Sequence, residues 1–87
     1  MRSIRFEPSA WEEFSEWQRK DVKLWKKLVD LLTETARTPF EGKGKPEALK
    51  HDYKGYWSRR LTREHRIVYK VTDEIIIVVA CMGHYED

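Results

Sequence analysis

Three side chains in the second half of the chain have the chemistry needed to cleave RNA without a metal ion. They are Glu47, Arg66 and His84. In such a reaction the ribose 2′-hydroxyl supplies the nucleophile. The protein must then provide a base for that hydroxyl, an acid for the departing 5′-oxygen and a cation for the phosphorane charge. A carboxylate, an imidazole and a guanidinium suit these three roles.

Other kinds of catalytic or cofactor site find little support. The stretch GKGKPE lacks the G-x-x-x-x-G-K-[ST] pattern of a phosphate loop, and Pro46 stands where the following helix should begin. The three histidines and single cysteine show no close spacing of metal ligands. No G-x-S-x-G motif or Cys/His pairing indicates an acyl-transfer nucleophile. We therefore expect neither a cofactor nor a metal ion.

Positive charge is concentrated in the middle of the chain, although the formal net charge is only +2. Residues 37–70 carry ten basic and four acidic side chains, whereas residues 71–87 carry four acidic and no basic ones. A basic region of this kind suits a polyanionic partner such as nucleic acid, and a solvated lysine-rich loop is the alternative. The candidates for phosphate contacts are Lys43, Lys45 and Lys50.

The length of 87 residues allows one domain, which we expect to span residues 1–87. Cys81 is the only cysteine, so a disulfide or thiolate zinc site within one chain is excluded and a reducing compartment is indicated. The longest apolar run, residues 75–82, falls short of the roughly 18 residues that suggest a membrane span, and no signal peptide is evident. We predict a cytoplasmic protein outside the membrane.

The first half of the chain predicts a short strand and two helices. Alternating polar and apolar residues indicate a strand at residues 3–6. Ser9 and Glu12 form the pattern of a capping box for a helix that runs to about Arg19. Asp21 can cap a second helix that ends before Pro39. The apolar face of this second helix comprises Trp25, Leu28, Val29, Leu32 and Ala36.

The second half predicts a long functional connection over residues 40–55 and then three strands within YWSRRLT, HRIVYKV and IIIVVACM. Their short links require antiparallel pairing. We expect an α+β domain of order β-α-α-β-β-β, with a helix hairpin on one face of a small twisted sheet. Arg66 then shares a face with Lys70 and not with Tyr69. Arg59 and Arg60 point to opposite faces, so at most one of them joins Arg66 directly.

The stretch RTPFEGKGKPEALKHDYKGYWSRRLTREHRIVYKVTD, followed by a hydrophobic strand and His-Tyr, resembles the YoeB or Txe-type toxins of the RelE/ParE superfamily. The resemblance runs essentially end to end and includes Trp11 and Trp17. It implies a mainly antiparallel microbial RNase fold and a metal-independent endoribonuclease that cuts mRNA in the A site of the 70S ribosome, leaving a 2′,3′-cyclic phosphate. Contacts with rRNA, a homodimer and a YefM-type antitoxin are also implied.

The same resemblance assigns roles to individual residues. Glu47 corresponds to the general base, Arg66 to the group that stabilises the phosphorane, and His84 to the general acid. Tyr85 would stack on or orient a substrate base. Trp57 also matches the family, with a core role as the alternative. The RNA-facing region corresponds to Lys50, His51, Arg59 and Arg60, alongside Lys43 and Lys45.

Two features depart from the family pattern. Gly83 precedes the histidine, and we expect it to loosen the backbone that aims His84. Glu86 and Asp87 follow the His-Tyr pair, at which family members commonly end. Their carboxylates would weaken RNA binding unless they turn outward or raise the proton affinity of His84. Two other functions stay open: a ParE-like topoisomerase poison and a non-catalytic RNA or ribosome-binding module. The joint presence of a base, an acid and a phosphorane cation favours the enzyme over the poison.

Overall fold

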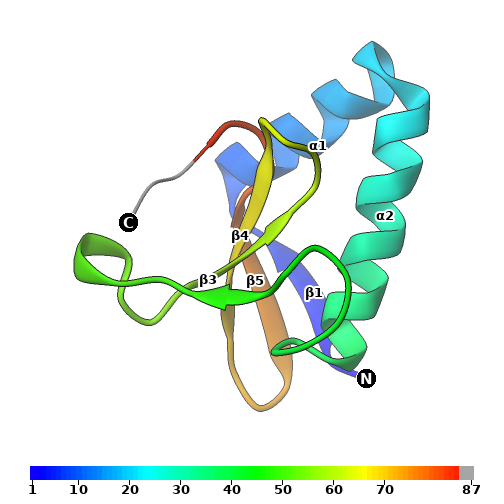
Figure 1. Ribbon diagram of the computed structural model, residues 1–87. Coiled ribbons are helices and arrows are strands. Elements are labelled where there is room, and N and C mark those ends of the chain that lie inside the picture. Colours follow the sequence, from blue (N-terminus) through cyan, green and yellow to red (C-terminus); the bar gives the residue numbers. More distant parts are fainter. Residues whose placement is uncertain (85–87) are drawn as a thin grey trace.

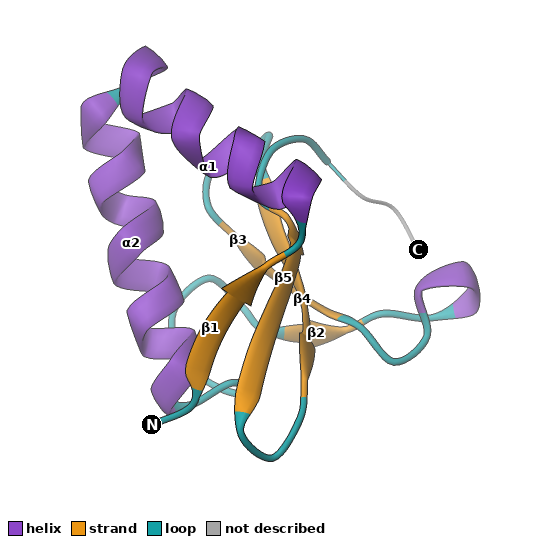
Figure 2. Cartoon of the chain, turned by 180° about the vertical axis from the view of Figure 1, so that it is seen from behind, coloured by secondary structure: helices purple, strands orange, loops and turns teal. Residues whose placement is uncertain are grey.

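Two helices cover one face of a five-stranded sheet in the computed structural model, which describes residues 1–84 (Figures 1 and 2). The elements follow one another as β1 (Ser3–Phe6), α1 (Pro8–Lys20), α2 (Val22–Arg37), β2 (Glu47–Ala48), the 3-10 helix η1 (His51–Tyr53), β3 (Trp57–Arg60), β4 (Arg66–Val71) and β5 (Ile75–Ala80). The strand order in the sheet is β1-β5-β4-β3-β2. The predicted α+β class and helix hairpin are confirmed.

The sheet is mixed but mostly antiparallel. β1 pairs in parallel with β5, and the other neighbouring pairs are antiparallel. The predicted order of elements omitted β2, which lies inside residues 40–55, the segment expected to be a long functional connection. Two residues are too few to show an alternating pattern, so only the pairing with β3 defines this strand. The segment around η1 projects from the side of the molecule away from α2 (Figures 1 and 2).

The helix ends follow simple capping chemistry. α1 begins at Pro8 after the N-cap residue Glu7, which makes no side-chain cap hydrogen bond, so the predicted capping box of Ser9 and Glu12 is wrong. Proline favours the first helical position because its φ is already helical and it lacks an N–H, which places Ser9 inside the helix. The Asp21 cap is confirmed, because its carboxylate accepts a hydrogen bond of 3.1 Å from the backbone N–H at position 24 of α2.

The main core lies between the helices and the sheet. The buried residues of α2 are Leu28, Leu31, Leu32, Thr35 and Ala36, so the predicted face is largely correct. Cys81 is fully buried, and this burial, with the nearby Glu13 carboxylate, raises the pKa of its thiol to about 12. Cys81 therefore acts as a core residue and not as a reactive thiol. Within residues 1–84, no helix has the length and apolar character to span a bilayer.

Candidate active site

Glu47 and Arg66 lie on the face of the sheet opposite the helices. Glu47 pairs with Ser58 on β3, which in turn pairs with Val68 on β4. Paired residues share a face, as do alternate residues of one strand, so Arg66 projects on the same side as Glu47. The two residues are two strands and two positions apart, which corresponds to a Cα separation of about 12 Å. This spacing leaves room for a nucleotide between the two side chains.

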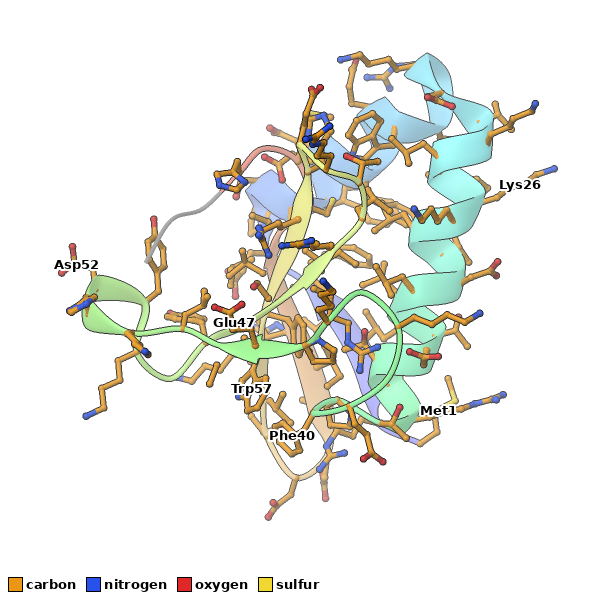
Figure 3. All side chains as sticks on the ribbon, in the orientation of Figure 1. Met1, Lys26, Phe40, Glu47, Asp52 and Trp57 are labelled. Carbon is orange, nitrogen blue, oxygen red and sulfur yellow. The ribbon has the colours of Figure 1, made fainter. Side chains whose placement is uncertain are left out.

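Trp57 occupies the other side of the sheet. It is the β3 neighbour of Ser58, and its ring lies 4.8 Å from that of Phe40, measured between centroids. Figure 3 shows Glu47 on one side of the β2–β3 ribbon, with Trp57 and Phe40 on the other. Trp57 packs against the main core as a partly buried residue. These contacts support the core role for Trp57.

Arg66 stands in an environment suited to an anion. It is partly buried, and its Nε is a buried nitrogen without a hydrogen-bond partner among residues 1–84. Arg66 also pairs directly with Arg60 across β3 and β4. Like charges placed opposite each other destabilise a sheet, whereas an anion bound between them would offset that repulsion and satisfy the unused donor. A phosphate group has the charge and the acceptors for this position.

The segment after β5 brings His84 beside Arg66. The backbone N–H of Arg66 donates to the carbonyl oxygen of Gly83 at 2.9 Å. The N–H of Gly83 donates to Nδ1 of His65 at 2.8 Å. Gly83 has φ of 95°, a conformation that favours glycine. The expectation that Gly83 loosens the backbone is therefore wrong, because hydrogen bonds hold the peptide groups on both sides of it. His84 is exposed, whereas Tyr85 and the two terminal carboxylates that follow it lie outside the described residues.

The predicted basic contacts divide into two groups. Lys43, Lys45 and Arg60 line a cleft of about 520 Å³ beside α2. Lys50 and His51 belong to the segment around η1, on the side of the molecule away from α2. All five side chains are exposed, as contacts with phosphates require. In the chain, β2 with its candidate base lies between the lysines of the first group and the two residues of the second.

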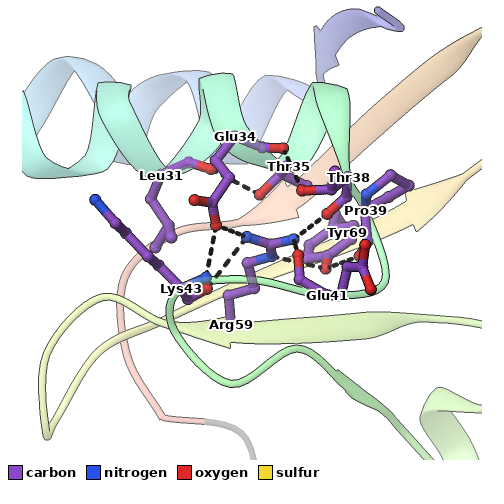
Figure 4. A network of polar contacts seen from close by, with 9 residues as sticks. All are labelled: Leu31, Glu34, Thr35, Thr38, Pro39, Glu41, Lys43, Arg59 and Tyr69. Atoms are coloured by element: carbon purple, nitrogen blue, oxygen red, sulfur yellow. Dashed lines mark hydrogen bonds and ion pairs between the residues drawn. The ribbon is translucent and has the colours of Figure 1, made fainter.

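Arg59, by contrast, is fully buried, and the prediction that it faces RNA is wrong. All five of its N–H donors are used within the chain (Figure 4). Nη1 donates to Glu34 Oε2 at 2.7 Å, where it also forms an ion pair, and Nε donates to the Tyr69 hydroxyl at 3.2 Å. The remaining bonds go to the carbonyl oxygens of Thr38, Glu41 and Lys43.

Arg59 therefore fixes the loop that leads from α2 to β2. Tyr69 extends the network, because its hydroxyl donates to the carbonyl oxygen of Pro39 at 2.6 Å, and burial raises its pKa. Glu34 holds the same loop through a 2.6 Å hydrogen bond from the Lys43 backbone N–H. The loop carries two exposed lysines and ends at Glu47, so this buried network positions the candidate base and part of the basic surface.

Glu34 should make the protein sensitive to acid. The Lys43 N–H, followed by Arg59, holds the pKa of the Glu34 carboxyl below its usual range, against the opposing effect of desolvation. This stabilisation is present above the unfolded-state pKa of about 4.3 and is lost as pH falls through the lower folded-state value. The free energy of unfolding, measured with urea from pH 7 to pH 3, should therefore fall more steeply below about pH 5 for wild type than for Glu34→Gln.

Asp30→Asn is the matched control for Glu34→Gln, because it removes an exposed carboxylate from the same helix and so corrects for the change in net charge. The acid-sensitive component should persist in this variant. Parallel curves for wild type and Glu34→Gln would contradict the assignment of the acid sensitivity to the Arg59 network.

The face opposite the helices thus combines a carboxylate, a guanidinium with an unused donor, and a histidine whose preceding peptide is fixed beside that arginine. These are the groups that acid–base cleavage of a phosphodiester uses. Neither the clamped backbone of Gly83 nor the buried role of Arg59 has a recognisable sequence motif. Within residues 1–84, no group of three or more His, Cys, Asp or Glu side chains could hold a metal ion.

Comparison with known proteins identifies relatives of the whole fold. Residues 6–85 match the family model described as the YoeB-like toxin of bacterial type II toxin-antitoxin systems. The toxin YoeB of Escherichia coli K12 is 53% identical over 76 residues, which cover 87% of this chain and 90% of the relative. The solved YoeB/ParE toxin from Agrobacterium tumefaciens is 45% identical with a TM-score of 0.91, covering 95% of this chain and 99% of that one.

Two further solved structures are assemblies. The YoeB dimer from Staphylococcus aureus is 44% identical with a TM-score of 0.89, covering 97% of this chain and 98% of that one. The heterotetrameric YoeB-YefM toxin-antitoxin complex from the same organism is 43% identical with a TM-score of 0.88, covering 98% and 99%. The relatives found by sequence and those found by fold therefore carry the same family name, YoeB.

Proposed function

Because this chain belongs to the YoeB family of toxins of bacterial type II toxin-antitoxin systems, we propose that it is a ribosome-dependent endoribonuclease. It cuts mRNA in the A site and so inhibits translation in the cytoplasm. The observation that carries the proposal is the hydrogen bond from the Arg66 N–H to Gly83, which supports an acid at His84 beside a phosphate site at Arg66. Glu47 projects from the same face of the sheet.

The proposed reaction assigns one role to each group. Glu47 removes the proton from the ribose 2′-hydroxyl, whose oxygen attacks the adjacent phosphorus. Arg66 stabilises the negative charge of the phosphorane. His84 gives a proton to the departing 5′-oxygen, so the products are a 2′,3′-cyclic phosphate and a 5′-hydroxyl. No metal ion takes part in this proposal, and Tyr85 stacks on or orients a substrate base.

The exposed cations bind and orient the RNA. Lys43 and Lys45 are proposed to contact phosphates beside α2, and Lys50 and His51 phosphates near η1. Arg60 is proposed to share a phosphate with its cross-strand neighbour Arg66. Contacts of this kind fix the register of the RNA without reading its sequence. The ribosome supplies much of the orientation of the mRNA, so naked RNA should be a poor substrate.

The partners follow from the family. We propose that the chain forms a homodimer and is neutralised by a YefM-type antitoxin, as the similar YoeB dimer and YoeB-YefM complex of Staphylococcus aureus suggest. The 70S ribosome, with its mRNA and rRNA, is the proposed target.

The test is to incubate the purified protein with ribosomes programmed with a defined mRNA and to map the new 5′ ends, with naked mRNA as control. The proposal expects cuts aligned with the A-site codon and little cleavage of naked RNA. Intact mRNA together with arrested DNA supercoiling would favour a topoisomerase poison instead. Blocked translation with intact mRNA would favour a non-catalytic ribosome-binding module.

A further inference from the structure

We propose that His65 is a positioning residue that holds the backbone of Gly83 and thereby keeps His84 beside Arg66. Nδ1 of His65 accepts a 2.8 Å hydrogen bond from the Gly83 N–H, and the next residue, Arg66, donates its N–H to the Gly83 carbonyl at 2.9 Å. Two adjacent residues thus clamp both peptide units around one glycine. The significance of this clamp for catalysis rests on the proposed function.

His65 is itself held by the turn between β3 and β4. Its carbonyl oxygen accepts hydrogen bonds from the N–H groups of Leu61 at 2.9 Å and Thr62 at 3.1 Å. Its own N–H donates to the Thr62 hydroxyl at 3.0 Å. These bonds fix the residue from which the imidazole projects, so the ring provides a rigid acceptor.

The imidazole ring is also anchored to α1. It lies edge-on to the buried Trp17, with 4.8 Å between ring centroids and 84° between ring planes. The Trp17 Nε1 donates to the carbonyl oxygen of Cys81 at 2.9 Å, two residues before Gly83. Because Nδ1 accepts a hydrogen bond, the neutral ring carries its proton on Nε2. The position of the acceptor atom, Nδ1 of His65, is therefore fixed by the ring contact with Trp17 and by the backbone hydrogen bonds of His65.

The clamp compensates for a permissive position. Among residues 1–84, a Cβ at Gly83 would meet no atom within 4 Å, so these residues do not restrict it sterically. Glycine has more accessible backbone conformations than other residues. Without the clamp, ordering Gly83 when RNA binds would therefore cost conformational entropy. Since a misplacement of about 1 Å can cost about 10² in rate, loss of the clamp should reduce turnover more than substrate binding.

Two substitutions distinguish the role of His65 as a hydrogen-bond acceptor from the packing of its ring. His65→Phe keeps an aromatic ring against Trp17 but has no acceptor. His65→Asn loses the ring but places an amide oxygen near the former position of Nδ1. The Gly83 amide can be followed by NMR in the free protein, because the chain contains only four glycines. We expect its proton resonance to move upfield and its exchange with solvent to accelerate in His65→Phe, and both to stay close to wild type in His65→Asn.

This NMR measurement does not depend on cleavage. An unchanged Gly83 amide in His65→Phe would overturn the clamp, and loss of protection in both variants would assign the effect to ring packing and overturn it too. Urea denaturation of each variant reports global stability, so that local release of Gly83 can be distinguished from general unfolding.

Single-turnover cleavage of ribosome-bound mRNA tests the catalytic consequence. His65→Phe should lower the maximal rate by about 10- to 100-fold with little change in the half-saturating protein concentration, and His65→Asn should recover most of the loss. Wild-type cleavage rates in a His65→Phe protein whose Gly83 amide is released would overturn the positioning role. If wild type fails to cleave at all, the proposed function fails, whereas the NMR result still decides whether the clamp exists.

Discussion

Glu47→Gln and His84→Gln are each expected to lower the rate of mRNA cleavage on the ribosome by about 10²- to 10⁴-fold, the usual contribution of one general base or acid. Glutamine retains size and polarity but can neither remove the 2′-hydroxyl proton nor donate a proton from an imidazolium. Both side chains are exposed, so the free energy of unfolding should change little. Single-turnover assays with saturating protein measure the chemical step.

Glu64→Gln is the matched control for Glu47→Gln, because it neutralises another exposed carboxylate of the basic region without touching the proposed site. It should cleave mRNA at a rate close to wild type. A Glu47→Gln or His84→Gln protein that cleaves as fast as this control would remove that residue from the mechanism.

Arg59→Met is expected to destabilise the protein by about 3–5 kcal/mol, because three loop carbonyl oxygens lose their donor and each unsatisfied acceptor costs about 1–3 kcal/mol. The substitution leaves Glu34 without its ion-pair partner and takes the donors away from three loop carbonyl oxygens. Arg59→Lys keeps the charge but lacks the planar fork of donors, so it should also be destabilising. Urea denaturation at pH 7 measures both effects.

The neighbouring arginine provides the control for this prediction. Arg60 is exposed on the opposite face of β3, so Arg60→Met should change the free energy of unfolding by no more than about 0.5 kcal/mol. Substitution of Arg59 should thus lower stability, whereas substitution of Arg60 should weaken RNA binding. Equal stability of the two methionine variants would contradict the assignment of Arg59 to the buried network.

Much of the fold follows from local patterns in the sequence. The alternation in β4 correctly separates Arg66 from Tyr69, whose ring lies in the core. Asp21 is correctly predicted to cap α2 because the cap depends on neighbouring residues alone. The incorrect predictions also have identifiable physical causes. The helix-starting preference of Pro8 overrides the apparent cap at Ser9, and β2 exists only through its pairing with a distant strand.

The site is harder to derive because its decisive contacts are long-range. Alternation predicts that Arg59 and Arg60 point apart, but it does not say which of them is buried. The Glu34 partner of Arg59 lies 25 residues away, and the carbonyl oxygens that accept its other bonds have no sequence signature. Long-range contacts also explain the wrong prediction for Gly83. In the sequence a glycine suggests flexibility, but in the structure hydrogen bonds with Arg66 and His65, which precede it by 17 and 18 positions, hold its backbone.

The nucleophile is the central element of the proposed chemistry, and a single 2′-deoxy nucleotide tests it directly. Programmed ribosomes would receive either an all-ribose mRNA or the same mRNA with one 2′-deoxy nucleotide at the mapped cut, and the fragment ends would be analysed after a single turnover. We predict a 2′,3′-cyclic phosphate and a 5′-hydroxyl from the all-ribose mRNA and no cut at the deoxy position. Cleavage at the deoxy position would contradict attack by the 2′-hydroxyl and with it the roles proposed for Glu47, Arg66 and His84.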